Sequence, residues 1–125
     1  MDVEKITPAE LEILKVLWQA EEPLTFPQIR ERLREKNDWA DSTIQTLLRR
    51  LYAKEILHQE KRELLTYAPL VTEKAYKQHE AKALADRLFH GSARELFAAF
   101  ISSGSISRQE REELHRLIDE GEKDG

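Results

Sequence analysis

Helix-start signals recur along this chain and divide it into short helices. Thr7-Pro8-Ala9-Glu10 places a Thr cap, a Pro at the first helical position and a Glu three residues after the cap. Further cap candidates are Thr25, Asp41 or Ser42, Thr72, Ser92 and Ser107. Apolar residues follow each signal at helical spacing. The pattern predicts helices over 8–20, 26–36, 42–55, 73–89, 93–103 and 108–120, the last ending at Gly121.

Helical spacing is lost between residues 57 and 68. Leu57–Glu60 and Leu65–Ala68 are typical of two short strands joined by a turn, and Leu24–Thr25 can form a very short third strand. The order helix, short strand, helix, helix, hairpin is that of a winged helix-turn-helix. We therefore expect a mainly α protein, with a winged helix-turn-helix domain over residues 1–71 and a small helical domain over 72–125.

Composition excludes several classes of function. The 125 residues include no Cys, which excludes disulfides, thiolate metal clusters and a Cys nucleophile. All four Gly lie at or beyond position 91, so the first 90 residues hold no Gly-rich phosphate loop. The sequence has no Gly-x-Ser-x-Gly motif, and none of its four His pairs at the spacing of a helical zinc site. We expect no enzyme activity, no metal and no cofactor.

Targeting signals are also lacking in the sequence. No apolar run reaches the roughly 20 residues that a transmembrane helix needs. Met1–Lys5 lacks the basic region that opens a signal peptide, and no apolar region follows it. We therefore expect a cytoplasmic protein that does not insert into a membrane.

A basic region lies within an otherwise acidic chain. The formal net charge is −4, but residues 42–62 hold five Lys and Arg against two Glu, a local charge of +3. The exposed face predicted for the third helix carries Ser, Thr, Gln and Arg side chains, which suit base edges and phosphates of a major groove. Candidate DNA contacts are Ser42, Thr43, Gln45, Thr46, Arg49, Arg50, Lys54, and Lys61 and Arg62 at the hairpin tip. The alternatives are a merely solvated face and a winged-helix module that binds proteins and not DNA.

The C-terminal helices carry more apolar residues than a segment of this length buries alone. These are Leu84, Leu88, Phe89, Leu96, Phe97, Phe100, Ile101, Leu114, Leu117 and Ile118. They can pack on the N-terminal domain or against the same helices of a second chain. We favour the second arrangement, a homodimer that places two recognition helices on the two half-sites of a palindrome.

Three stretches carry a resemblance to a known family. The Thr-Ile-x-Thr-Leu-x-x-Arg-Leu pattern at 43–51, within Asp41–Leu57, resembles the recognition helix of the penicillinase repressor family of bacteria. Ile6–Trp18 resembles its first helix, with Glu10 and Trp18 in place. His90–Ser92, followed by Leu96 and Phe100, resembles its dimerisation region. The resemblance implies a dimeric repressor that binds a dyad-symmetric operator in double-stranded DNA and blocks transcription.

The resemblance also bears on how such a repressor is controlled. The copper-responsive branch of the family binds metal through C-terminal cysteines, which this chain does not have. In the β-lactam-responsive branch a membrane sensor-protease signals, and the repressor is cut between Asn and Phe. The matching pair is Ala99-Phe100, where Phe is kept and Ala replaces Asn. The resemblance thus implies a proteolytic control site at this pair and a membrane sensor-protease as a partner.

Overall fold

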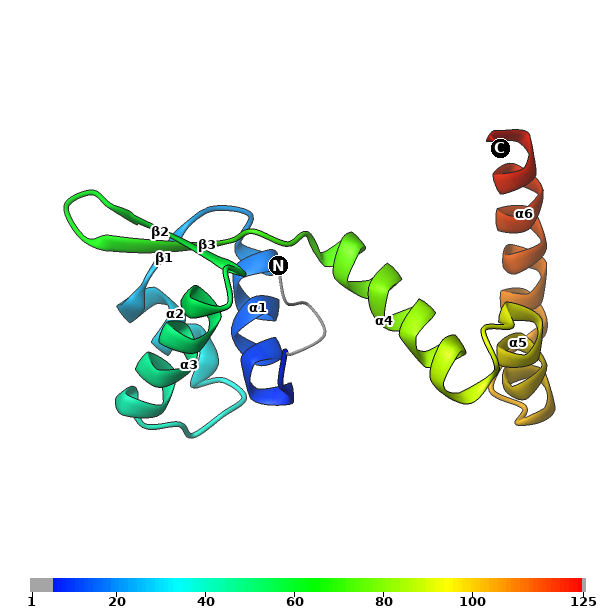
Figure 1. Ribbon diagram of the computed structural model, residues 1–125, viewed down its shortest axis with the longest axis horizontal. Helices are drawn as coiled ribbons and strands as arrows, with labels where there is room; N and C mark the ends of the chain where they lie inside the picture. The colour runs from blue at the N-terminus through cyan, green and yellow to red at the C-terminus, as the bar shows by residue number, and fades with distance from the viewer. Residues whose placement is uncertain (1–5, 125) are drawn as a thin grey trace. The chain divides into compact units, whose positions relative to one another are not determined.

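A computed structural model describes residues 6–124 of the chain, with side chains described for residues 6–121. Residues 1–5, on which the expected lack of a signal peptide partly rests, lie outside the described residues. The chain forms two compact units, the first ending at His79 and the second beginning at Glu80 (Figure 1). Among the described residues, no helix has the length and apolar character needed to cross a membrane.

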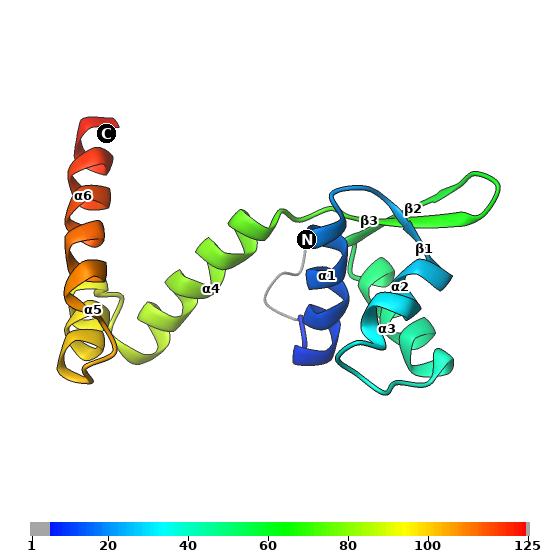
Figure 2. The same cartoon turned by 180° about the vertical axis from the view of Figure 1, so that it is seen from behind.

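The first unit is a winged helix-turn-helix, as predicted. It consists of α1 (Pro8–Ala20), β1 (Leu24–Thr25), α2 (Phe26–Leu33), α3 (Asp41–Ala53), β2 (Leu57–Lys61) and β3 (Leu65–Pro69). The strands form an antiparallel sheet in the order β1-β3-β2, in which Leu24 pairs with Tyr67 and Gln59 pairs with Tyr67 from the other side. Figures 1 and 2 show the β2–β3 hairpin reaching past α2 and α3.

Capping boxes begin the first two helices of this unit. The Thr7 hydroxyl accepts a hydrogen bond from the Glu10 amide at 3.2 Å, and the Glu10 carboxylate accepts one from the Thr7 amide at 2.9 Å. Thr25 and Gln28 form the same pair of bonds at the start of α2. Each box satisfies two amides that a helix end would otherwise leave unpaired.

The boundaries of α2 and α3 differ from the prediction. α2 ends at Leu33, where the amide of Asn37 bonds the Leu33 carbonyl in a turn, because no further apolar side chain follows on its buried face. The N-cap of α3 is Ala40, which makes no side-chain cap bond, so the prediction of Asp41 or Ser42 as cap is wrong. α3 ends at Ala53, and Glu55 turns the chain with a positive φ of 63°.

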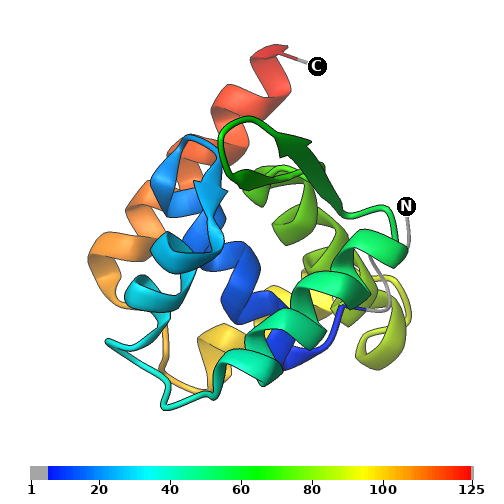
Figure 3. The ribbon, with the colours of Figure 1, turned by 90° about the vertical axis from the view of Figure 1, so that its left-hand side faces the viewer.

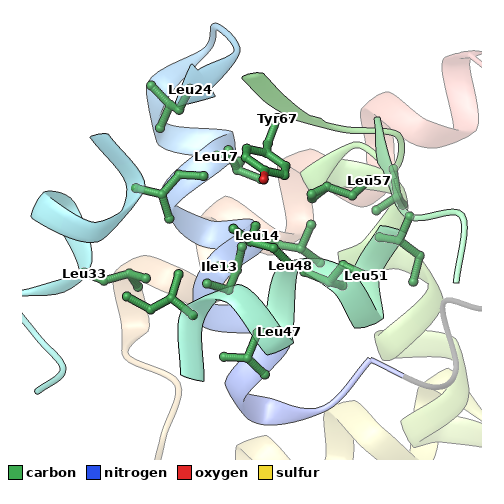
Figure 4. Close-up of a cluster of buried hydrophobic side chains, with 14 of the residues drawn as sticks. Ile13, Leu14, Leu17, Leu24, Leu33, Leu47, Leu48, Leu51, Leu57 and Tyr67 are labelled. Carbon is green, nitrogen blue, oxygen red and sulfur yellow. The ribbon is translucent and has the colours of Figure 1, made fainter. Parts of the chain in front are cut away.

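One apolar core lies between α1, α2, α3 and the sheet. Figure 4 shows side chains from these elements converging on it. Its fully buried members are Ile13, Leu14, Leu17, Leu24, Ile29, Leu33, Ile44, Leu48, Leu51, Ile56 and Leu57. Burying a side chain of this kind contributes about 1.5–3 kcal/mol. The core therefore holds α3 against the rest of the unit.

The second unit continues from the middle of α4 (Glu73–Leu88) through α5 (Ala93–Ser102) to α6 (Arg108–Asp124). The Thr72 hydroxyl caps α4 by accepting from the Ala75 amide, and Ser107 with Glu110 forms a complete capping box for α6. The prediction that α6 ends at Gly121 is wrong. A single Gly costs only about 1 kcal/mol in a helix, so it weakens the helix without stopping it.

The start of α4 is part of the first unit and packs against α1. The Trp18 indole N–H donates to the Val71 carbonyl at 2.9 Å, and the Trp18 and Tyr76 rings lie 5.7 Å apart between centroids. The division between the units consequently falls inside α4, after the boundary at 71/72 that the sequence suggested.

Candidate nucleic-acid interface

α3 has one buried and one polar face. Its buried stripe is Ile44, Leu47, Leu48 and Leu51, which pack into the core. The opposite face carries side chains that are exposed or half-buried: Ser42, Thr43, Gln45, Thr46, Arg49 and Arg50. The structure thus brings six of the nine candidate contacts together on one helix that the core holds in place. A helix of this kind fits the major groove of DNA.

Two of these side chains differ in what they can offer a base. The Thr46 hydroxyl donates to the Ser42 carbonyl within α3 at 2.9 Å, so its proton is already engaged. Thr46 can therefore present a methyl group and an acceptor oxygen. The Gln45 amide keeps both a donor and an acceptor, which is the combination that recognises adenine.

The hairpin brings a second basic group to the same side of the unit. Figure 3 shows α3 and the hairpin both facing the viewer. Lys61 is exposed. Residues two apart along a strand point to the same face, so Lys61 lies on the same sheet face as Leu57 and Gln59, which is the face that covers the core. Arg62 lies in the turn and is exposed, with its guanidinium 3.4 Å from the Glu60 carboxylate.

Lys54 does not lie with the other candidates. Its ammonium nitrogen is 2.6 Å and 2.9 Å from the two carboxylate oxygens of Glu10, a residue with 0% exposure. The pair joins the C-terminal end of α3 to the first turn of α1. This contact gives Lys54 a structural role that spacing on one helix could not reveal, and we leave it out of the DNA-binding surface proposed below.

The environment of Glu10 acts on its pKa in two directions. Burial raises the pKa, but hydrogen bonds from Lys54 and Thr7 and the Lys54 charge outweigh burial and hold the pKa below its ordinary value of 4.5. Glu10 is thus ionised at neutral pH and balances the Lys54 ammonium inside the fold.

Sequence reasoning also missed a contact between α2 and α3. Arg30 Nη1 lies 3.1 Å from Asp41 Oδ2, and the Arg30 guanidinium lies over the Phe26 ring at 5.6 Å from its centroid. Asp41 was a cap candidate from its place in the sequence, but its carboxylate faces α2 instead. The approach of α2 to α3 in the helix-turn-helix order was the one signal that could have suggested this pair.

The predicted dimerisation residues form no core within the second unit. Leu88, Phe97, Phe100, Ile101, Leu117 and Ile118 are each at least 40% exposed. Leu84, Phe89, Leu96 and Leu114 are half-buried. Among the described residues of this unit, Ala85 is the buried hydrophobic side chain. A cavity of about 170 Å³ opens between α5 and α6, lined mainly by Phe97, Ile101, Ile106, Leu114 and Ile118.

The pair Ala99-Phe100 lies inside α5, and both residues are exposed. The Ala99 carbonyl accepts a hydrogen bond from the Ser103 amide at 3.1 Å. A protease that needs extended backbone would have to open this part of the helix before it could cut the bond.

Comparison with known proteins identifies the family of this chain. A family model described as penicillinase repressor matches residues 6–120. This chain belongs to the penicillinase repressor family. It is 29% identical over 119 residues to the penicillinase repressor of Bacillus licheniformis, covering 94% of this chain and 92% of that protein. It is 28% identical to the methicillin resistance regulatory protein MecI of Staphylococcus aureus, covering 91% and 93%.

Two solved structures share the fold of part of the chain. One is the solution structure of the DNA-binding domain of the repressor BlaI, with 32% identity and a TM-score of 0.54. The other is the monomeric form of Bacillus licheniformis BlaI in complex with the blaP half-operator, with 32% identity and a TM-score of 0.53. Each match covers 60% of this chain and 92% of the solved chain. The match agrees with the winged helix-turn-helix described above.

Proposed function

We propose that this protein is a homodimeric transcriptional repressor that binds a dyad-symmetric operator. In this proposal α3 of each protomer enters the major groove, and the β2–β3 hairpin contacts the DNA backbone beside it. Contacts come from the candidate residues other than Lys54: Ser42, Thr43, Gln45, Thr46, Arg49, Arg50, Lys61 and Arg62. No cofactor is required.

One observation supports DNA binding above the others. A relative that is 32% identical over 60% of this chain has been solved on half of an operator, and α3 here presents uncharged polar groups flanked by arginines on a helix that packs into the core. Short polar side chains suit base edges, and arginines suit phosphates. A protein-interaction surface would not need basic groups on both the helix and the hairpin.

The apolar surface of the second unit supports the dimer. Six large apolar side chains are exposed there on a single chain, and the cavity between α5 and α6 is open to receive side chains from another copy. A two-fold dimer would cover these residues and join two half-site contacts, so that the second half-site binds at high effective concentration. We assign DNA binding to residues 1–71 and dimerisation to residues 72–125, which begin with α4.

Control by proteolysis is the finer part of the proposal. Cleavage at Ala99-Phe100 by a membrane sensor-protease would separate Phe100 and Ile101 from Phe97 on the apolar face of α5. The dimer would lose part of its surface, and the operator would be released. Because Ala99 stands where the family has Asn, this proposal requires a protease that accepts Ala before Phe, and a protease specific for Asn-Phe should leave this chain intact.

A binding experiment separates the repressor from a protein-interaction module. A duplex would be selected by the protein from a random library, and its binding compared with that of a shuffled duplex of equal composition. We expect the selected duplex to bind at least about 10³-fold more tightly, with affinity falling steeply between about 50 and 200 mM salt. Failure to enrich any sequence would rule out the repressor and leave the interaction module.

A further inference from the structure

An exposed ion pair joins α2 to the first turn of α3. The distance of 3.1 Å between Arg30 Nη1 and Asp41 Oδ2 is that of a charge-assisted hydrogen bond. The two side chains are 32% and 54% exposed. A pair this open to water contributes little to folding stability. Any larger effect of the pair should therefore be on the charge of this surface and not on folding stability.

Asp41 lies where a negative charge would oppose DNA. It is the single carboxylate in α3, whose sequence is DSTIQTLLRRLYA. Asp41, Gln45 and Arg49 follow one another at intervals of four residues, so they share a stripe along the helix. A carboxylate on this stripe would repel a nearby phosphate and offset the attraction of Arg49.

Arg30 is held in a position to cancel that charge. The Phe26 ring lies beneath its guanidinium, at 5.6 Å from Cζ to the ring centroid, which restricts the side chain by a cation–π contact. Ala40 provides no side-chain cap to α3, and the Asp41 carboxylate bonds Arg30 of α2 at 3.1 Å. Phe26, Arg30 and Asp41 thus form a small assembly from two helices.

We propose that Arg30 is a positioning residue for DNA binding, which acts through Asp41. By neutralising the carboxylate and holding it against α2, Arg30 keeps the stripe of Gln45 and Arg49 open to DNA. This inference rests on the DNA-binding function proposed above. It differs from a direct phosphate contact by Arg30, because removing Asp41 should then make Arg30 dispensable.

The test measures binding of the full-length protein to the selected and shuffled duplexes by fluorescence anisotropy at several salt concentrations. We expect Arg30→Ala to weaken binding to both duplexes about threefold for each half-site, the effect of one unit charge at about 7 Å in water. The double variant Arg30→Ala with Asp41→Asn should return to within about twofold of the wild type, with the wild-type salt dependence.

Arg32→Ala is the matched control. It removes the same charge from the same helix, but Arg32 lies on the other flank of α2, where it lines a cavity with Glu12 and Lys15 of α1. We expect it to weaken binding less than Arg30→Ala does. Thermal unfolding of each variant checks that the fold is kept.

Two results would overturn the inference. One is a double variant that stays as weak as Arg30→Ala with a salt slope lower by about 0.9, which indicates a lost phosphate contact. The other is an equal effect of Arg30→Ala and Arg32→Ala, which indicates a response to total charge. A wild-type protein that does not prefer the selected duplex would instead refute the proposed function itself.

Discussion

The ion pair between Glu10 and Lys54 offers a direct test of how α3 is held. Lys54→Met keeps the length and much of the volume of the side chain but removes the charge. It would leave the Glu10 carboxylate, which has 0% exposure, with the hydrogen bond from the Thr7 amide but without the Lys54 ammonium. Breaking a buried pair from one side costs about 3–5 kcal/mol, because the remaining charge has lost its partner. We expect a loss of stability of this size at neutral pH.

Glu10→Gln should cost less than Lys54→Met. The Gln side chain still offers an oxygen to the Thr7 amide, and the Lys54 side chain, 23% exposed, can regain contact with water. The loss should be about 1.5–3 kcal/mol, the range for a hydrogen bond to a charged group. The double variant should be more stable than the sum of the two losses implies, since it removes both charges of the pair together.

The pH dependence has a defined sign. In the wild type the pKa of Glu10 lies below its ordinary value of 4.5, so the pair stabilises the fold above that value and less as pH falls through the folded-state pKa. In Lys54→Met the opposing effect of Lys54 is gone and burial raises the pKa. The buried Glu10 charge then lowers the stability of the variant at neutral pH, and protonation of Glu10 at lower pH removes this loss. The stability gap between the two proteins should shrink from about pH 7 to about pH 3.

The assay is denaturant unfolding followed by circular dichroism at several pH values. Lys15→Met is the matched control, because Lys15 pairs with Glu12 at the surface with 52% of its side chain exposed. Its effect should remain below about 1 kcal/mol and show little dependence on pH. A gap for Lys54→Met that is equally small, or that does not change with pH, would refute this account of the pair.

Three further predictions concern the DNA surface, the dimer and the domain boundary. Gln45→Ala should lose about 1–3 kcal/mol of binding free energy on the selected duplex and little on the shuffled one. Arg49→Ala should weaken binding to both duplexes and lower the salt slope by about one unit. Equal losses of Gln45→Ala on both duplexes would show that Gln45 does not recognise a base. Phe100→Asp should give monomers in sedimentation and weak operator binding, whereas Ala98→Asp, on the opposite face of α5, should stay dimeric; a Phe100→Asp dimer would contradict the assigned interface. A fragment of residues 1–79 should be about 1–3 kcal/mol more stable than one of residues 1–71, because it keeps Tyr76 against Trp18, and equal melting curves would show that this contact adds nothing.

Local signals in the sequence were sufficient for most of the fold. The Thr7 and Thr25 caps, the apolar stripe of α3 and the loss of helical spacing after Leu57 are each set by neighbours within a few residues. They correspond to α1, α2, α3 and the hairpin in the structure. Errors lie at helix ends, where Ala40 and not Asp41 caps α3 and where Gly121 does not stop α6.

The contacts that sequence reasoning missed join residues far apart in the chain. From the sequence, Lys54 was one more basic residue of the third helix. In the structure it pairs with Glu10 of α1, which is 44 positions away in the chain. Asp41 was predicted to cap the third helix, but its carboxylate pairs with Arg30 of α2. Tyr76 lies beyond the predicted domain boundary at 71/72, but its ring packs against Trp18 of α1. Spacing along one helix predicts which face is polar, but it does not reveal which polar groups another helix has already engaged.

Chemical protection of guanine N7 on the selected duplex tests the central claim most directly, because N7 lies in the major groove. If two copies of α3 read a dyad, two protected segments related by two-fold symmetry should appear, with centres separated by about one helical turn or a multiple of it. Gln45→Ala should weaken both segments together. Tight binding of the duplex with no protected N7, or with a single protected segment for the full-length protein, would contradict the account.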